Sequence, residues 1–141
     1  MTVLQSKVLN LCWAVLGGFI GWFLGGFDDL LYALLTFVIA DYITGVLCAV
    51  NERKLSSEIG FRGINRKILI FILVGVANIV DLHILKHGTP LRTATICFYI
   101  SNEGISLLEN AGRLGLPFPK KLKDILEQLR NDKEDWLNDN F

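Results

Sequence analysis

Acidic side chains inside long apolar runs are the first residues of this sequence that could do chemistry. Asp41 lies at the middle of an apolar run from 30 to 50, and Thr44 follows it on the same helical face. Asp81 lies near the end of a second run, from 68 to 85. A charge at the centre of a membrane costs about 2.5–3.5 kcal/mol and persists where it is shielded or useful. Each acid therefore either fixes helix packing through a hydrogen bond or faces a path of water.

A stripe of polar residues follows in the segment from 92 to 112. At helical spacing it consists of Thr95, Tyr99, Asn102, Ser106, Glu109 and Arg113. Glu103 and Asn110 lie at its edge, and Arg92, at the start of the segment, is expected to pair with Asp81. Four short helices leave a single chain little interior for so long a stripe, which predicts that several chains associate around water. A helix lying at the membrane surface would instead turn the same stripe to the cytoplasm.

The other reactive residues show no enzymatic or metal-binding pattern. Cys12, Cys48 and Cys97 lie far apart in apolar runs, and no Cys-x-x-Cys or Cys/His spacing occurs. His83 and His87 have no nucleophile motif beside them. We therefore expect no catalytic residue, no metal site and no cofactor.

The composition indicates that these segments belong to a membrane protein. The 141 residues include 14 Lys+Arg and 14 Asp+Glu, 52% are apolar, and the mean hydropathy is +0.44. The balanced charge excludes a basic nucleic-acid binder, and the apolar content excludes a disordered chain. We therefore expect an all-α integral membrane protein.

Four segments are expected to cross the membrane, because about 20 mostly apolar residues span its core. They are 8–27, 30–50, 68–85 and 92–112, with a polar loop at 51–67. The fourth has a charge-free centre of only ten residues, 93–102, so three spans with this segment at the interface is the alternative. Basic residues gather in the loop and after residue 112, which predicts that the loop and both termini are cytoplasmic. Residues 1–114 then form the transmembrane domain.

Small residues recur along one side of the first span. Ala14 begins the stripe, and Gly17, Gly21 and Gly25 continue it at intervals of four. Gly45 similarly keeps the Asp41 face of the second span small. Small residues let two membrane helices approach closely. The first stripe is expected to pack against the second span of the same chain or against another subunit.

The chain becomes polar after the fourth segment. Residues 115–141 are expected to form a cytoplasmic amphipathic helix and an acidic tail. Pro119 suits the start of the helix, and apolar residues then recur at helical spacing at Leu122, Ile125, Leu126 and Leu129.

A series of short blocks runs in order from about residue 30 to about residue 130. They are 41–45 (DYITG), 54–57 (KLSS), 60–63 (GFRG), 91–94 (LRTA), 98–104 (FYISNEG), 108–112 (LENAG), 115–119 (GLPFP) and the helix expected at 122–129. In order and spacing they resemble the phage-lysis and toxin-secretion holins of Gram-positive bacteria and their prophages.

The resemblance implies a non-enzymatic pore former that oligomerises in the bacterial cytoplasmic membrane. Its lesions would release an endolysin or a toxin without needing direct contact with that cargo. The motif positions Asp41, Arg92, Asn102, Glu103 and Glu109 coincide with the polar positions described above, which favours a role in assembly or in the lumen. The alternative is a small multi-span transporter or ion channel, although the first span carries no acid.

Overall fold

The computed structural model describes residues 2–121, 124–125 and 128. Its elements are α1 (Val3–Leu24), α2 (Asp29–Asn51), α3 (Ser57–Val80), a π-helical turn η1 (Asp81–Leu85) and α4 (Pro90–Arg113). The described residues contain helices and no strands, which confirms the all-α prediction. Of the predicted C-terminal helix, residues 120–121, 124–125 and 128 are helical, whereas Leu122, Leu126 and Leu129 lie outside the described residues.

Side-chain caps set where the first three helices begin. Thr2 and Gln5 form a reciprocal capping box at α1. The Asp28 carboxylate accepts a hydrogen bond from the Leu31 amide at 3.0 Å, and the Ser56 hydroxyl accepts one from the Ile59 amide at 3.2 Å. These caps satisfy backbone donors that the first turn of a helix leaves free.

The loop between the second and third helices is shorter than predicted. The sequence predicts a polar loop over 51–67, but the Ser56 cap starts α3 at Ser57 and only 52–56 separates it from α2. The helix therefore includes Lys67, which hydropathy alone assigns to the loop.

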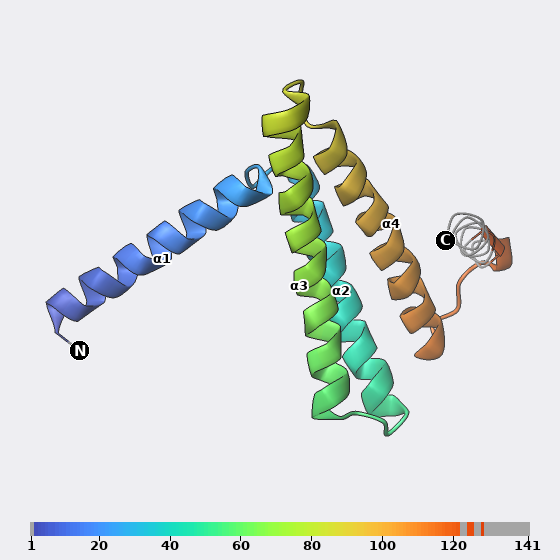
Figure 1. The fold of residues 1–141 in the computed structure, drawn as a ribbon. Helices are drawn as coiled ribbons and strands as arrows, with labels where there is room; N and C mark the ends of the chain where they lie inside the picture. The colour runs from blue at the N-terminus through green and yellow to red at the C-terminus, as the bar shows by residue number, and fades with distance from the viewer. Residues whose placement is uncertain (1, 122–123, 126–127, 129–141) are drawn as a thin grey trace.

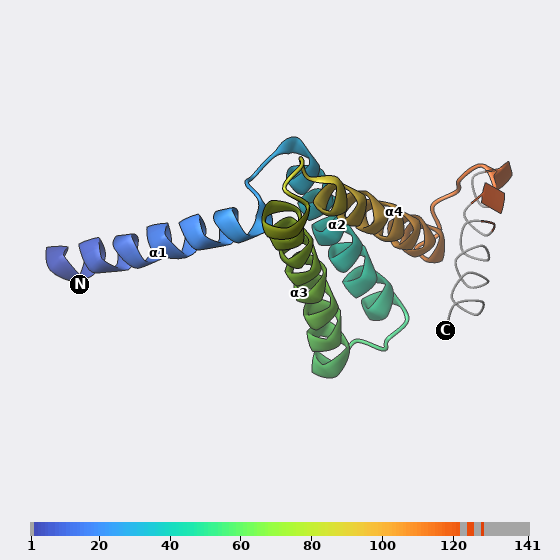
Figure 2. The ribbon, with the colours of Figure 1, turned by 45° about the horizontal axis from the view of Figure 1, so that its top comes forward.

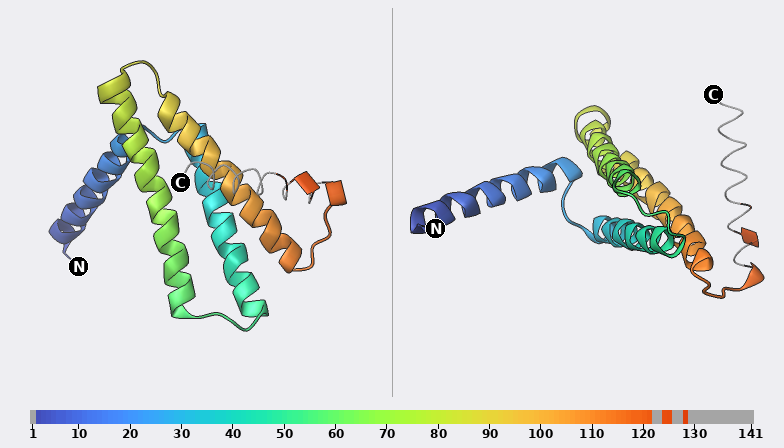
Figure 3. Two further views of the ribbon diagram at one scale, coloured as in Figure 1. Left: turned by 45° about the vertical axis from the view of Figure 1, so that its right-hand side comes forward. Right: turned by 90° about the horizontal axis from the view of Figure 1, so that it is seen from below.

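Helices α2, α3 and α4 pack together, while α1 extends away from them (Figures 1 and 2). Helix α4 lies along α2 and runs in the same direction, and α3 runs in the opposite direction (Figure 3). Toward the 52–56 loop, α4 diverges from α3 (Figures 1 and 3). Gly25 and Gly26, with φ of +82° and +94°, turn the chain between α1 and α2. Such angles suit glycine because it lacks a Cβ.

The apolar core occupies the half of the bundle next to this turn. It consists of Leu24, Leu31, Leu34, Val38, Ile70, Val74 and Ile96. The polar residues Asp41, Lys67 and Glu103 come next along α2, α3 and α4, toward the diverging ends. The core therefore separates one buried polar cluster at the turn from a second one near the middle of the helices.

Three helical segments are long and apolar enough to cross a membrane. They are Val3–Leu24, Asp29–Asn51 and Ser57–Leu85. They match the first three predicted spans, with different ends. Helix α4 exists where the fourth span was predicted, but it is not among these three.

The small-residue stripe of α1 does not pack against α2 in this chain. Residues 7–20 are all exposed, including Ala14, and a Cβ at Gly17 would have no neighbouring atom within 4 Å. A Cβ at Gly21 would meet only the Phe27 ring, and Gly25 is the left-handed cap that ends the helix. Packing against the second span of the same chain is therefore not found. Gly45 does lie at a helix contact, because a Cβ there would be 3.7 Å from the Asn110 amide nitrogen.

Candidate functional site

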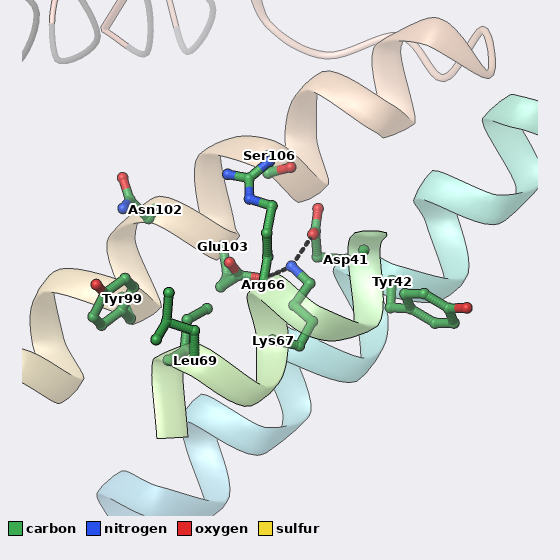
Figure 4. A pocket seen from close by; sticks show the side chains of 11 residues that line it. Asp41, Tyr42, Arg66, Lys67, Leu69, Tyr99, Asn102, Glu103 and Ser106 are labelled. Atoms are coloured by element: carbon green, nitrogen blue, oxygen red, sulfur yellow. Dashed lines mark hydrogen bonds and ion pairs between the residues drawn. The ribbon is translucent and has the colours of Figure 1, made fainter. Parts of the chain in front are cut away.

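A lysine side chain joins two carboxylates at the centre of the bundle. The Lys67 ammonium of α3 donates hydrogen bonds to Asp41 of α2 and to Glu103 of α4 (Figure 4). The side chains are 17%, 10% and 10% exposed, in that order. We call these three residues the charge triad. It places opposite charges from three helices in contact where little water reaches them.

An open cleft of about 390 Å³ lies beside the triad (Figure 4). It is lined by Asp41, Tyr42, Gly63, Arg66, Lys67, Leu69, Ile70, Tyr99, Asn102, Glu103 and Ser106. Its wall therefore combines charged, hydroxyl and amide groups from α2, α3 and α4. A cleft of this size and polarity is large enough to admit water beside the triad.

Asn110 extends this polar contact along α2 and α4. Its amide nitrogen donates to Asp41 Oδ1 at 3.1 Å and lies 3.1 Å from the Thr44 hydroxyl. The Cys48 thiol donates to the Asn110 carbonyl at 3.4 Å. Asp41 is thus held by both Lys67 and Asn110, so the hydrogen-bond prediction for this acid is met within one chain.

A second buried cluster surrounds Arg92 at the turn between α1 and α2. Its guanidinium donates to the carboxylate oxygens of Asp28 at 2.7 and 3.1 Å. It also donates to the carbonyl oxygens of Leu24 at 2.6 Å and Gly26 at 3.1 Å. The Arg92 side chain is 3% exposed, whereas that of Asp28 is 48% exposed. One arginine therefore connects the end of α1, the start of α2 and the start of α4.

Asp81 has a different role from the predicted one. Its carboxylate accepts hydrogen bonds from the backbone amides of Leu91 at 3.1 Å and Arg92 at 2.8 Å. It thereby caps α4, whose own cap residue Thr89 makes no side-chain hydrogen bond. The prediction that the Arg92 side chain pairs with Asp81 is wrong, because Asp28 lies within reach of the guanidinium and Asp81 is occupied by the amides.

Two carboxyl groups that flank α2, those of Asp28 and Glu52, have shifted pKa values. The hydrogen bonds from Arg92 lower the pKa of Asp28 below its ordinary 3.8. At the opposite end of the bundle, Arg113 of α4 donates to Glu52 at 2.7 and 3.0 Å and lowers the pKa of that carboxyl. Helix α4 is thus tied to both ends of α2.

The stripe predicted on α4 does not coincide with its most buried face. The buried residues of this helix are Arg92, Ile96, Glu103 and Asn110, so the polar positions at the edge of the stripe face the neighbouring helices, Glu103 toward Lys67 of α3 and Asn110 toward Asp41 of α2. Tyr99, Asn102 and Ser106 line the cleft, Thr95 donates to the Leu91 carbonyl at 2.7 Å, and Glu109 is exposed. The structure therefore divides the stripe between cleft and surface.

The acids are sheltered within one chain, contrary to expectation. Asp41, Asp81 and Glu103 are all buried. Among the described residues, every buried side-chain nitrogen or oxygen has a hydrogen-bond partner. Their shelter therefore does not require a second subunit, and it gives no support by itself for association.

Sequence reasoning misses one of the residues that provide this shelter, because hydropathy places Lys67 in a loop. Asn78, one turn before Asp81, instead donates to the Phe23 carbonyl at 3.1 Å and links α3 to the end of α1. Ser56, a good N-cap, is the signal that could have placed Lys67 inside a helix. Across the described ranges, no group of three or more His, Cys, Asp or Glu could hold a metal ion.

Three helices long and apolar enough to cross a membrane, two of which contribute to the charge triad, are typical of a multi-pass helical membrane protein. The model of the bacteriophage holin family matches residues 18–131, and the chain belongs to this family. The family suggests a non-enzymatic membrane protein.

Several relatives resemble most of the chain. It is 45% identical over 133 residues to the uncharacterized 14.9 kDa protein in the nagH 3′ region of Clostridium perfringens, covering 92% of this chain and 100% of that one. It is 38% identical over 101 residues to the probable holin of Bacillus phage phi105, covering 72% of this chain and 74% of that protein. No solved structure matches it.

Proposed function

We propose that this protein is a holin that oligomerises in the bacterial cytoplasmic membrane and opens lesions there. An endolysin, or in some settings a toxin, leaves the cell through these lesions, and the protein needs no direct contact with that cargo. The observation that carries the proposal is the family match over residues 18–131, which includes all three helices of the charge triad. Buried charges in the middle of membrane helices are costly and commonly mark a functional pathway.

Helix α4 forms the fourth span in this proposal. It lies along α2 and is tied to both ends of it, through Arg92 with Asp28 and through Arg113 with Glu52. If α2 crosses the membrane, these ties hold α4 at the same depth. The buried partners of α4 compensate for its lower hydropathy. With four spans, both termini and the 52–56 loop lie on the cytoplasmic side, where basic residues are favoured.

The exposed helix α1 is the proposed contact between subunits. Its small residues Ala14, Gly17 and Gly21 have no helix of their own chain against them. Close approach of a second helix would supply the packing that drives association in lipid. In the assembly, the cleft residues Tyr99, Asn102 and Ser106 face the lumen. Thr44, Thr95 and Glu109 are further candidates for this lining.

Permeability of vesicles to solutes of graded size tests this function. The purified protein is reconstituted into liposomes that contain an ion indicator, fluorescent dextrans or a folded hydrolase. A holin that releases endolysin lets the folded hydrolase escape above a threshold ratio of protein to lipid. A chain that inserts and accumulates without changing permeability refutes the proposal.

A small ion channel or transporter is the second candidate. The cleft favours it, because opposite charges and hydroxyl groups line an open polar space beside the triad. Passage of ions alone, at a rate proportional to the amount of protein and without growth arrest of expressing cells, would support this candidate over the holin.

A further inference from the structure

The charge triad links α3 to the neighbouring helices α2 and α4. Toward the 52–56 loop, α3 diverges from α4, and a cleft lined by residues of α2, α3 and α4 lies beside the triad (Figures 3 and 4). Lys67 crosses this opening to reach both Asp41 and Glu103. The lysine is therefore placed where it can hold α3 and α4 together beside the open cleft.

Separation of these helices has different consequences in lipid and in water. In hydrocarbon, an unpaired Lys67 or Glu103 would have to hold its charge without hydration or give it up, and either is costly, so the closed arrangement is favoured. Where neighbouring subunits admit water, both groups can be hydrated after separation. The same contact is thus strong in a lipid-surrounded subunit and weak in a wet assembly.

We propose that the charge triad is a lock that holds the polar face of α4 closed within a single subunit. Its release, accompanied by entry of water into the cleft, converts the subunit to the form that lines a lumen. The inference rests on the proposed function, since it concerns how that lumen becomes available. It explains how a chain that buries its charges internally can later expose them to water.

Removing Lys67 while leaving the two acids tests the lock. In Lys67→Gln, Asp41 and Glu103 face each other without a cation, and their repulsion pushes α4 outward. The control is Arg62→Gln, which removes a cation from the exposed side of the same helix, where Arg62 pairs with Glu58. The exchange variant Lys67→Glu with Glu103→Lys restores one cation between two acids.

Opening of the cleft is measured with a cysteine at a position that lines it. Ser106→Cys is combined with each variant in liposomes, and a water-soluble maleimide is applied. The rate is measured on the peptide that contains residue 106, because native cysteines also react. Each rate is divided by that of Arg62→Gln at the same pH. Release of a trapped dye is recorded in parallel.

We expect Lys67→Gln to label about fivefold faster than the control at about pH 7.5 and to release dye at a lower ratio of protein to lipid. At a lower pH both differences should shrink, because a proton shared by the two carboxylates removes their repulsion. The other groups facing the triad are Tyr42 on α2, Arg66 on α3 and Tyr99 on α4.

The exchange variant should label and release dye like the control at both pH values. Equal behaviour of Lys67→Gln and Arg62→Gln overturns the lock, as does failure of the exchange to restore the control rates. If the Lys67→Gln variant does not accumulate in the membrane, the Lys67→Glu variant is used in its place. The exchange variant, which adds Glu103→Lys to it, must then restore accumulation. If wild-type protein releases no dye at all, the pore proposal fails, whereas the labelling rates still decide whether the triad closes the cleft.

Discussion

The buried arginine at the turn between α1 and α2 provides the most direct test of the fold. Arg92→Gln keeps part of the side chain and one hydrogen-bonding end but removes the charge and most donors. The wild-type guanidinium makes four hydrogen bonds, two to Asp28 and one each to the carbonyls of Leu24 and Gly26. The change therefore loosens three chain segments at once.

The expected cost follows from what each partner loses. Breaking a fully buried ion pair from one side costs about 3–5 kcal/mol. Asp28 is half-exposed and regains water, which lowers this figure. The Leu24 carbonyl loses its donor at a buried residue, which costs about 1–3 kcal/mol. We expect a total of about 3 kcal/mol, or about 150-fold in the folding equilibrium constant.

Unfolding in mixed detergent micelles measures this change. Tryptophan emission is followed during titration with a denaturing detergent, since Trp22 lies at the joint and its carbonyl accepts from Asn78. Arg113→Gln is the matched control, because Arg113 also pairs with a carboxylate but is half-exposed. Its unfolding midpoint should stay close to that of wild type. An Arg92→Gln midpoint equal to that of Arg113→Gln would refute the assignment of Arg92 as the residue that joins the segments.

Three further changes test other features. The pKa of Asp28 in the folded chain lies below its ordinary 3.8, so the ionised carboxylate stabilises the fold above pH 3.8, and this stabilisation is lost as the pH falls through the lowered pKa. The Asp28→Asn variant should therefore lose less stability on acidification than wild type in unfolding titrations at a series of pH values. Gly25→Ala should destabilise the chain more than Gly26→Ala in the same titration, since only at Gly25 would the new Cβ collide with other side chains, those of Asn78 and Arg92. Gly17→Leu should leave the unfolding midpoint unchanged and reduce the amount of cross-linked oligomer in membranes. An unchanged amount of oligomer would show that α1 does not form the contact between subunits.

The sequence locates the helices better than their partners. Hydropathy identifies the first three apolar segments, because each is long and nearly free of charge. It places the start of α3 too late, since a membrane helix can extend past its apolar part when a cap such as Ser56 supports it. That error hides Lys67, the residue that completes the charge triad.

Partners of charged residues depend on geometry that no spacing rule gives. The sequence pairs Arg92 with Asp81, yet the π-helical turn directs Asp81 to the backbone amides of α4 and leaves the guanidinium to Asp28. The expectation that the acids need several chains for shelter fails for the same reason. Each buried acid finds a cation, an amide or a backbone donor on another helix of its own chain.

Helix α3 is fixed at its C-terminal end and carries Lys67, one of the three triad residues, partway along its length. Asp81, at its end, is fixed by the start of α4, while Ser57 lies beside a short loop at the diverging end. At a rise of 1.5 Å per residue, Lys67 is about 21 Å from Asp81 and Ser57 is about 36 Å from it. A swing about the fixed end is therefore multiplied by about 1.7 between Lys67 and Ser57. The helix acts as a lever that turns a small displacement at one ammonium group into a larger one at the membrane surface.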